Sequence, residues 1–240
     1  MSKKTGLLLI AAIVSNFNTY SIKFLTDTLD LINNGSEIVV SNFDANLDSM
    51  LNLWYVNNSL TYEADSFVDE KDSIIPDFSD SVYIDRISRI PSVVELSYNT
   101  IVRRYIEVYT QKRRKSVEAM LGLAQYYFPI FDEIFDSHDI PNELKYMSII
   151  ESALNPRAYS RARAVGLWQF MYGTGKLYGL TINSLVDERR DPIKSTHASA
   201  KFIKDLYNIY KDWILVIAAY NCGPGNVNRA IRRSGGKRNY

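Results

Sequence analysis

Residues 141–156 read PNELKYMSIIESALNP and combine a helix start, an apolar helical face and a helix stop. Pro141 suits the first turn of a helix, and Glu143 in that turn complements the positive end of the helix dipole. Asn155 precedes Pro156, and a residue before proline is pushed out of the helical region of backbone space. The stretch is therefore predicted to be one helix that stops at Asn155-Pro156.

Glu151 occupies an unusual position on this predicted helix. At about 100° per residue, Lys145, Ser148 and Ser152 share a narrow polar face, and Glu151 lies outside it in the apolar arc. A carboxylate against an apolar wall is poorly solvated, and this raises its pKa. A raised pKa keeps a proton available near neutral pH, as a general acid requires. Glu151 is therefore a candidate catalytic acid.

A competing interpretation makes Glu151 a structural residue. Three arginines follow it closely in the sequence, and a buried glutamate is commonly paired with a cation. The helix alone leaves both interpretations open. The candidate partners are Arg157, Arg161 and Arg163.

The next stretch, residues 158–178, reads AYSRARAVGLWQFMYGTGKLY and is rich in glycine and aromatic residues. Glycines let a backbone approach a ligand closely, and Gln169 offers both hydrogen-bond donors and acceptors. The faces of Trp168 and Phe170 would suit the apolar faces of sugar rings. The alternative is a turn-rich junction with core aromatics. The glycines in question are Gly166, Gly173 and Gly175.

A third stretch, residues 218–225, reads AAYNCGPG. An apolar helix ends there at Tyr220 and Asn221, because the Gly-Pro-Gly sequence breaks it. Such a helix end can present a phenol and an amide to a ligand, or it can be an ordinary helix terminus.

Helical periodicity begins at about Ser97 and continues to the end of the sequence. Helices are predicted at 98–105, around 117–124, at 198–210 and at 213–220. Pro129 is expected to end or kink the second of these, and Asp212 to cap the last. Residues 83–91 are ambiguous between an extended segment and a helical turn. The fold class is therefore mainly α.

The N-terminal part differs from the rest in composition. Lys3 and Lys4 precede the apolar run Gly6–Val14, which has the length of a signal-peptide core and is shorter than a membrane span. The predicted organisation is a signal peptide at 1–20, an irregular arm or linker at 21–96 and a catalytic domain at 97–240. Within the arm, Leu47 to Trp54 suggests a short amphipathic helix.

The net charge of +1 hides an asymmetry between the two ends of the chain. Residues 1–100 have 6 Lys and Arg against 14 Asp and Glu, which leaves 22 (28 − 6) against 13 (27 − 14) for the remainder. A basic C-terminal part favours anionic partners. It follows no recognised nucleic-acid motif, so we expect no nucleic acid. Cys222 is the one cysteine, and no zinc-type Cys/His spacing occurs, so we expect no metal.

Taken together, the three stretches resemble lytic transglycosylases with the lysozyme-like fold, and among them the membrane-bound lytic murein transglycosylase D type. The order and spacing of the family's motifs match. Tyr172 and Cys222 depart from it, standing where many members have proline and alanine. The matching residues are Glu151-Ser152, Asn155-Pro156, Ser160, Gly166-Leu167, Gln169, Met171, Thr174 and 219–225.

The resemblance implies a lysozyme-like catalytic domain that cleaves peptidoglycan between N-acetylmuramic acid and N-acetylglucosamine and leaves 1,6-anhydromuramic ends. Glu151 would act first as acid and then as base, and Tyr220 would orient it. Ser160, Gln169, Met171 and Asn221 would line the sugar subsites. No cofactor is implied.

The resemblance also carries expectations about the molecule as a whole. Members usually continue with further helices, so the domain is expected to lack its C-terminal part. We expect a monomer, exported to the periplasm or cell envelope, which an uncleaved signal would hold at the membrane.

Two other functions stay open on the sequence. A lysozyme-like hydrolase of the same fold would need a second carboxylate or a positioned water, for which Asp187, Glu188 and Asp191 are acidic candidates. An inactive peptidoglycan-binding module would keep the sugar-lining residues but would not depend on Glu151.

Overall fold

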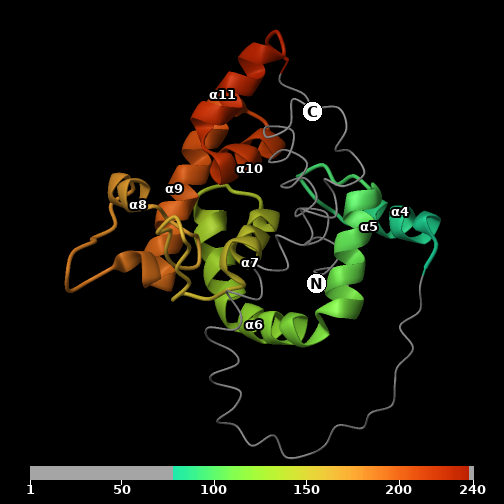
Figure 1. Ribbon diagram of the computed structural model, residues 1–240, viewed down its shortest axis with the longest axis horizontal. Helices are drawn as coiled ribbons and strands as arrows, with labels where there is room; N and C mark the ends of the chain where they lie inside the picture. Colours follow the sequence, from blue (N-terminus) through green and yellow to red (C-terminus); the bar gives the residue numbers. More distant parts are fainter. Residues whose placement is uncertain (1–77, 238–240) are drawn as a thin grey trace, which may run out of the picture.

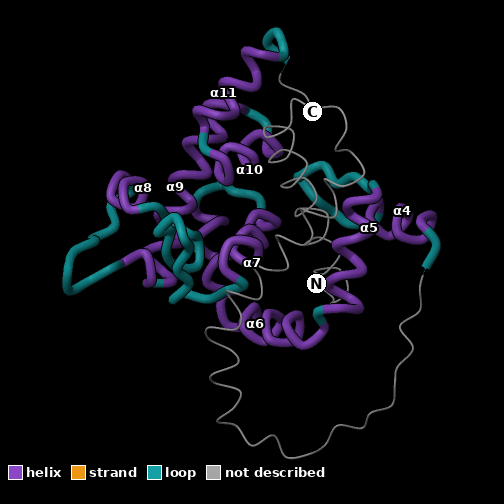
Figure 2. Tube along the Cα trace, viewed as in Figure 1, coloured by secondary structure: helices purple, strands orange, loops and turns teal. Residues whose placement is uncertain are grey.

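The computed structural model describes residues 78–237, which form helices joined by turns, with isolated bridges and no strand in that range (Figure 1, Figure 2). The mainly α fold class is confirmed. The α-helices are α4 (Asp80–Ser88), α5 (Thr100–Glu107), α6 (Arg114–Ser137), α7 (Met147–Ser152), α8 (Tyr172–Leu177), α9 (Pro192–Tyr210), α10 (Trp213–Cys222) and α11 (Pro224–Arg233). A π-helix, η2 (Val108–Lys112), and two 3-10 helices, η3 (Asn142–Tyr146) and η4 (Glu188–Arg190), complete the set.

The long helices α6 and α9 pack on each other, and α10 also packs against α9. In Figure 1 the short helix α7 occupies the centre of the molecule, with α4 and α5 on one side and α8 on the other. Trp168, in the turn before α8, is fully buried, with its ring centroid 5.1 Å from that of Phe131 and 5.5 Å from that of Phe135. Its indole nitrogen donates to the Thr196 hydroxyl of α9 at 2.9 Å. The segment around Trp168 is thereby attached to both long helices.

Helix caps explain where the two central C-terminal helices begin. The Asp191 side chain accepts from the backbone N–H groups of Ile193 and Lys194, and Pro192 occupies the first helical position of α9. Asp212 accepts from the N–H of Leu215 at the start of α10, which confirms the predicted cap. Each such cap is worth about 1 kcal/mol.

The structure corrects the expectation that Pro129 ends a helix, because α6 continues through it from Arg114 to Ser137. The proline ring of Pro129 is exposed, while the apolar side chains of Phe131, Ile134 and Phe135 beyond it are buried. Burial of three large side chains is worth several kcal/mol, about the cost of a proline inside a helix. Tertiary packing therefore stabilises α6 beyond Pro129.

The single helix predicted from Pro141 to Asn155 is also wrong. The chain forms the 3-10 turn η3 and then the short α-helix α7, which ends at Ser152. The ambiguous segment 83–91 lies mostly within α4.

The signal peptide, most of the arm at 21–96 and the short helix at Leu47–Trp54 lie outside the described residues and stay predictions. Within 78–237, none of the helices combines the length and the apolar character needed to cross a bilayer. The domain boundary proposed near residue 97 also stays a prediction.

Candidate functional site

Glu151 lies in the last turn of α7, next to an abrupt change of chain direction. Ala153 and Leu154, the two residues after the helix, both adopt the left-handed conformation, with φ of 52° and 62°. Their N–H groups donate to the carbonyls of Ile149 and Ser148 and so satisfy the helix end. Left-handed conformations are costly for residues other than glycine, and they accumulate where function over-determines the backbone. The turn ends α7 one residue after Glu151, at Ser152.

The Glu151 carboxyl is enclosed by protein atoms, although the residue as a whole is partly exposed. Desolvation raises its pKa to about 8. Within residues 78–237 it forms no hydrogen bond and no ion pair. Arg157, Arg161 and Arg163 are exposed and do not pair with it. The structural interpretation, in which one of these arginines neutralises Glu151, is therefore wrong for the described chain.

The polar face predicted on this segment faces the interior. Lys145, Ser148 and Ser152 are buried, at 8%, 0% and 0% exposure. The Lys145 ammonium pairs with Asp132 of α6 at 2.5 Å, and the Ser148 hydroxyl donates to the Lys145 carbonyl at 2.6 Å. The segment is thus fixed on its polar side, and Glu151 lies on the more accessible one.

Two hydrogen bonds connect α7 and α10 to consecutive carbonyls of the turn at Gly166–Gln169. The Ser152 hydroxyl lies 3.0 Å from the Leu167 carbonyl oxygen, to which it donates. The Tyr220 hydroxyl donates to the Trp168 carbonyl at 2.8 Å. Burial raises the pKa of the Tyr220 hydroxyl, and the charged form of Glu151 adds to this rise. The turn therefore brings Glu151 and Tyr220 together although they are far apart in sequence.

Gln169 belongs to the same turn and has a left-handed backbone, with φ of 48°. Its side-chain amide donates to the Gly166 carbonyl at 2.9 Å and lies 3.5 Å from the Ala158 carbonyl. Gln169 is partly exposed, so the rest of its hydrogen-bonding capacity is accessible to a ligand.

Gly166 has a different role from the ligand approach that the sequence suggested. A Cβ atom there would lie 1.9 Å from the Arg189 carbonyl oxygen, so the close approach is to η4. Gly175 is likewise tight against the side chains of Ile182 and Arg189, whereas Gly173 faces open space. Two of the three glycines therefore serve internal packing.

The other predicted sugar-lining residues lie on the surrounding loops. The Ser160 hydroxyl accepts from the Ala164 N–H at 3.0 Å and is partly exposed. Met171 is 46% exposed at the start of α8, and Asn221 is exposed near the end of α10. These positions are accessible to a ligand.

Trp168 and Phe170 cannot stack on a sugar, because they are buried at 0% and 2% exposure. Sequence reasoning also missed the residues that hold the turn in place. Arg189 of η4 is buried and donates to the carbonyls of Phe170 and Arg163 at 3.1 and 3.2 Å. An arginine next to the acidic pair Asp187-Glu188 was the available signal.

The three acidic candidates for a second catalytic carboxylate are all engaged elsewhere. Asp187 binds the Arg189 guanidinium through two bonds of 2.8 Å, and this lowers the pKa of Asp187. Glu188 accepts from the N–H of Thr181 and pairs with Lys194, and Asp191 caps α9. No Asp or Glu occurs from Ser152 to Val186 or after Asp212. In the segments that form the site, Glu151 is therefore the single carboxyl group.

A metal site is not evident in this part of the molecule. Within residues 78–237, no three His, Cys, Asp or Glu side chains gather closely enough to hold a metal ion.

Comparison with known proteins relates this arrangement to a family. Residues 130–240 match the family model of the transglycosylase SLT domain. The chain is 34% identical over 135 residues to "Membrane-bound lytic murein transglycosylase D" of Escherichia coli K12 and of strain CFT073, covering 56% of this chain and 30% of each relative. It is 38% identical over 115 residues to an Alteromonas sp. (strain M-1) protein whose name refers to tributyltin chloride resistance, covering 48% of this chain and 55% of that protein.

The chain thus spans about a third to a half of the length of these relatives. The matched region begins within α6 and contains Glu151, the Gly166–Gln169 turn and Tyr220. Residues 130–240 are therefore similar to the transglycosylase SLT domain family.

Proposed function

We propose that this protein is a peptidoglycan lytic transglycosylase, which cleaves the β-1,4 bond between N-acetylmuramic acid and N-acetylglucosamine. The observation that carries the proposal is the Glu151 carboxyl, which is desolvated, has no cationic partner in the described chain and stands alone in the segments that form the site. The match of residues 130–240 to the SLT family model supports the same reaction.

One carboxyl group suffices for this reaction. Glu151 donates its proton to the glycosidic oxygen, and the C1–O bond to N-acetylglucosamine breaks. The C6 hydroxyl of the muramic acid then attacks C1, and its proton passes to the Glu151 carboxylate. The products are a free 4-hydroxyl and a 1,6-anhydro ring, and the acid is restored. Because the nucleophile belongs to the substrate, its effective concentration is high and no second carboxylate is required.

The surrounding residues take supporting roles in this proposal. Tyr220 acts as a positioning residue, since its hydroxyl is anchored on the Trp168 carbonyl and its pKa responds to the charge of Glu151. Ser160, Gln169, Met171 and Asn221 line the sugar subsites, and their exposure is compatible with this role. With the signal predicted at 1–20, the enzyme works in the periplasm or cell envelope as a monomer.

The test is digestion of purified peptidoglycan followed by mass spectrometry of the released muropeptides. We expect 1,6-anhydro ends from the native protein and none from Glu151→Gln, which keeps the shape of the side chain but carries no acidic proton. Reducing muramic ends would instead show a hydrolase. Equal release by Glu151→Gln would show that Glu151 is not the acid. Binding without release by either protein would show a glycan-binding module.

A further inference from the structure

The loop that follows Glu151 is strongly basic. From Ser152 to Val186 the chain has four basic residues and no acidic ones, and three of the basic residues lie within 157–163. These three are exposed and form no ion pair within the described residues. Elsewhere in the same domain, basic residues such as Lys145, Arg189 and Lys194 have a carboxylate partner. The three unpaired residues are Arg157, Arg161 and Arg163.

The backbone that carries these arginines is fixed. Bridges join Tyr159 to Val165 and Val165 to Phe170, and the Ser160 N–H donates to the Ala164 carbonyl at 2.9 Å. The buried Arg189 side chain also donates to the Arg163 carbonyl at 3.2 Å. A rigid backbone lowers the entropy cost of binding, because only the side chains remain to be ordered.

The basic loop is attached directly to the candidate site. The Gly166 N–H donates to the Ala158 carbonyl at 3.0 Å, and the Gln169 amide lies 3.5 Å from the same carbonyl. Ser160, a proposed sugar-lining residue, lies between Arg157 and Arg161 in the loop itself. A glycan strand bound at Ser160 and Gln169 would therefore pass within reach of the guanidinium groups.

We propose that Arg157, Arg161 and Arg163 bind the carboxylates of the stem peptides on the glycan strand, so that the enzyme prefers peptide-bearing strands to strands stripped of their peptides. The inference rests on the proposed function. In a peptide-bearing strand the lactyl carboxyl of each muramic acid is bound in the amide to its stem peptide, so the free carboxylates belong to the peptides. Arginine forms forked, bidentate hydrogen bonds with carboxylates, which suits this recognition.

The expected preference is modest. Exposed arginine–carboxylate pairs each contribute little, so three of them together give roughly a tenfold higher kcat/KM for peptide-bearing strands. The preference weakens at high salt, because exposed charges are screened.

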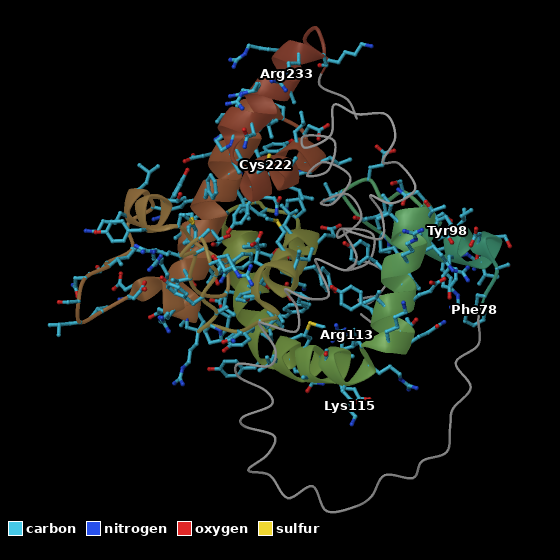
Figure 3. The ribbon with its side chains drawn as sticks, viewed as in Figure 1. Phe78, Tyr98, Arg113, Lys115, Cys222 and Arg233 are labelled. Carbon is cyan, nitrogen blue, oxygen red and sulfur yellow. The ribbon has the colours of Figure 1, made fainter. Side chains whose placement is uncertain are left out.

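The experiment uses three soluble glycan strands of equal length: one with its stem peptides, one stripped of them by an amidase and with the lactyl carboxyls thus exposed converted to amides, and one whose peptide carboxyls are converted to amides. The full chain is compared with a loop variant, Arg157→Gln, Arg161→Gln and Arg163→Gln. The matched control is Arg229→Gln, Arg232→Gln and Arg233→Gln, which removes the same charge from exposed positions on α11. In Figure 1 α11 extends away from α7, and Figure 3 labels Arg233 at the far end of α11. Thermal unfolding checks that both variants fold.

We expect the native protein and the α11 variant to prefer the peptide-bearing strand, and the loop variant to treat all three strands alike. Amidation of the carboxyls should remove the preference as completely as removal of the peptide. Equal kcat/KM of the native protein on all strands, or a preference that survives in the loop variant, would overturn the inference.

Binding of the same strands to the Glu151→Gln variant, measured by calorimetry, separates this inference from the proposed function. A binding preference that the loop arginines control, without any cleavage by the native protein, would support the basic loop and contradict the enzyme. Cleavage by the native protein together with equal binding of all strands would support the proposed function and contradict the role of the basic loop.

Discussion

Two carboxyl groups of this domain, Glu151 at the end of α7 and Asp187 beside η4, show how differently the fold treats the same chemical group. Asp187 is bound by the buried Arg189 guanidinium, and its pKa is lowered. Glu151 is desolvated without such a partner, and its pKa is raised to about 8. The first arrangement favours the charged form and holds the turn in place. The second favours the protonated form and preserves a proton for transfer.

The largest expected difference between the two carboxyl groups is in activity. Glu151→Gln should lower kcat by a factor of about 100 to 10,000, the usual contribution of a general acid. Asp187→Asn should retain most of kcat at a temperature where it is folded, because its role is structural. Release of anhydro-muropeptides over time measures both. Comparable losses of kcat in the two folded variants would remove the distinction.

The next largest effect is on stability, and here Asp187 dominates. Asp187→Ala leaves the buried Arg189 without its carboxylate, which should lower the free energy of unfolding by about 3 kcal/mol. Glu188→Ala, the control next to it, breaks an ion pair with the more exposed Lys194 and should cost clearly less. Urea denaturation measures both, and similar losses would show that the Asp187–Arg189 pair has no special weight.

The pH dependence of stability should have opposite signs at the two sites. Glu151 has a higher pKa in the folded state than in the unfolded one, so its charging weakens the fold as pH rises to about 8. Relative to the native protein, Glu151→Gln should therefore gain stability between pH 5 and pH 9, by an amount on the order of a few kcal/mol. A difference in melting temperature that stays constant over this range would contradict the raised pKa.

Asp187 provides the opposite trend for comparison. Its lowered pKa means that its contribution is present at neutral pH and is lost as pH falls through its folded pKa. The stability gap between the native protein and Asp187→Asn should thus close in acid, where the native carboxyl is also protonated. A gap that widens in acid would be the contrary result.

The smallest effect separates two buried serines of α7. Ser152→Ala and Ser148→Ala each remove one buried hydroxyl and should cost about 1 kcal/mol. Only the Ser152 hydroxyl reaches the Leu167 carbonyl of the turn, so Ser152→Ala alone should also lower kcat. Equal kcat values for the two variants would show that this bond does not position the site.

Much of the site could be predicted from local sequence. The cap at Asp212, the helix end before Gly223 and the unusual position of Glu151 all depend on residues close in sequence. The order of three motifs added the resemblance to the family whose model matches residues 130–240.

Long-range packing explains what could not be predicted. Periodicity placed Lys145, Ser148 and Ser152 on one face, but could not show that this polar face is the covered one, since Asp132 lies on another helix. The sequence left Trp168 open between a sugar contact and the core, because its partners Phe131, Phe135 and Thr196 come from the distant helices α6 and α9. Pro129 lies within a helix for the same reason, because distant side chains supply the stabilising burial.

The tight packing at Gly166 makes the position of Glu151 sensitive to a substitution that does not touch Glu151 itself. Any side chain at this position would overlap the Arg189 carbonyl, so either η4 or the turn would have to shift. A shift of the turn would move the carbonyl anchors of Ser152 and Tyr220 together, and with them the ends of α7 and α10. A displacement of about 1 Å can lower a reaction rate about a hundredfold. The single methyl group of Gly166→Ala should therefore slow the proposed reaction, although it lies behind the turn.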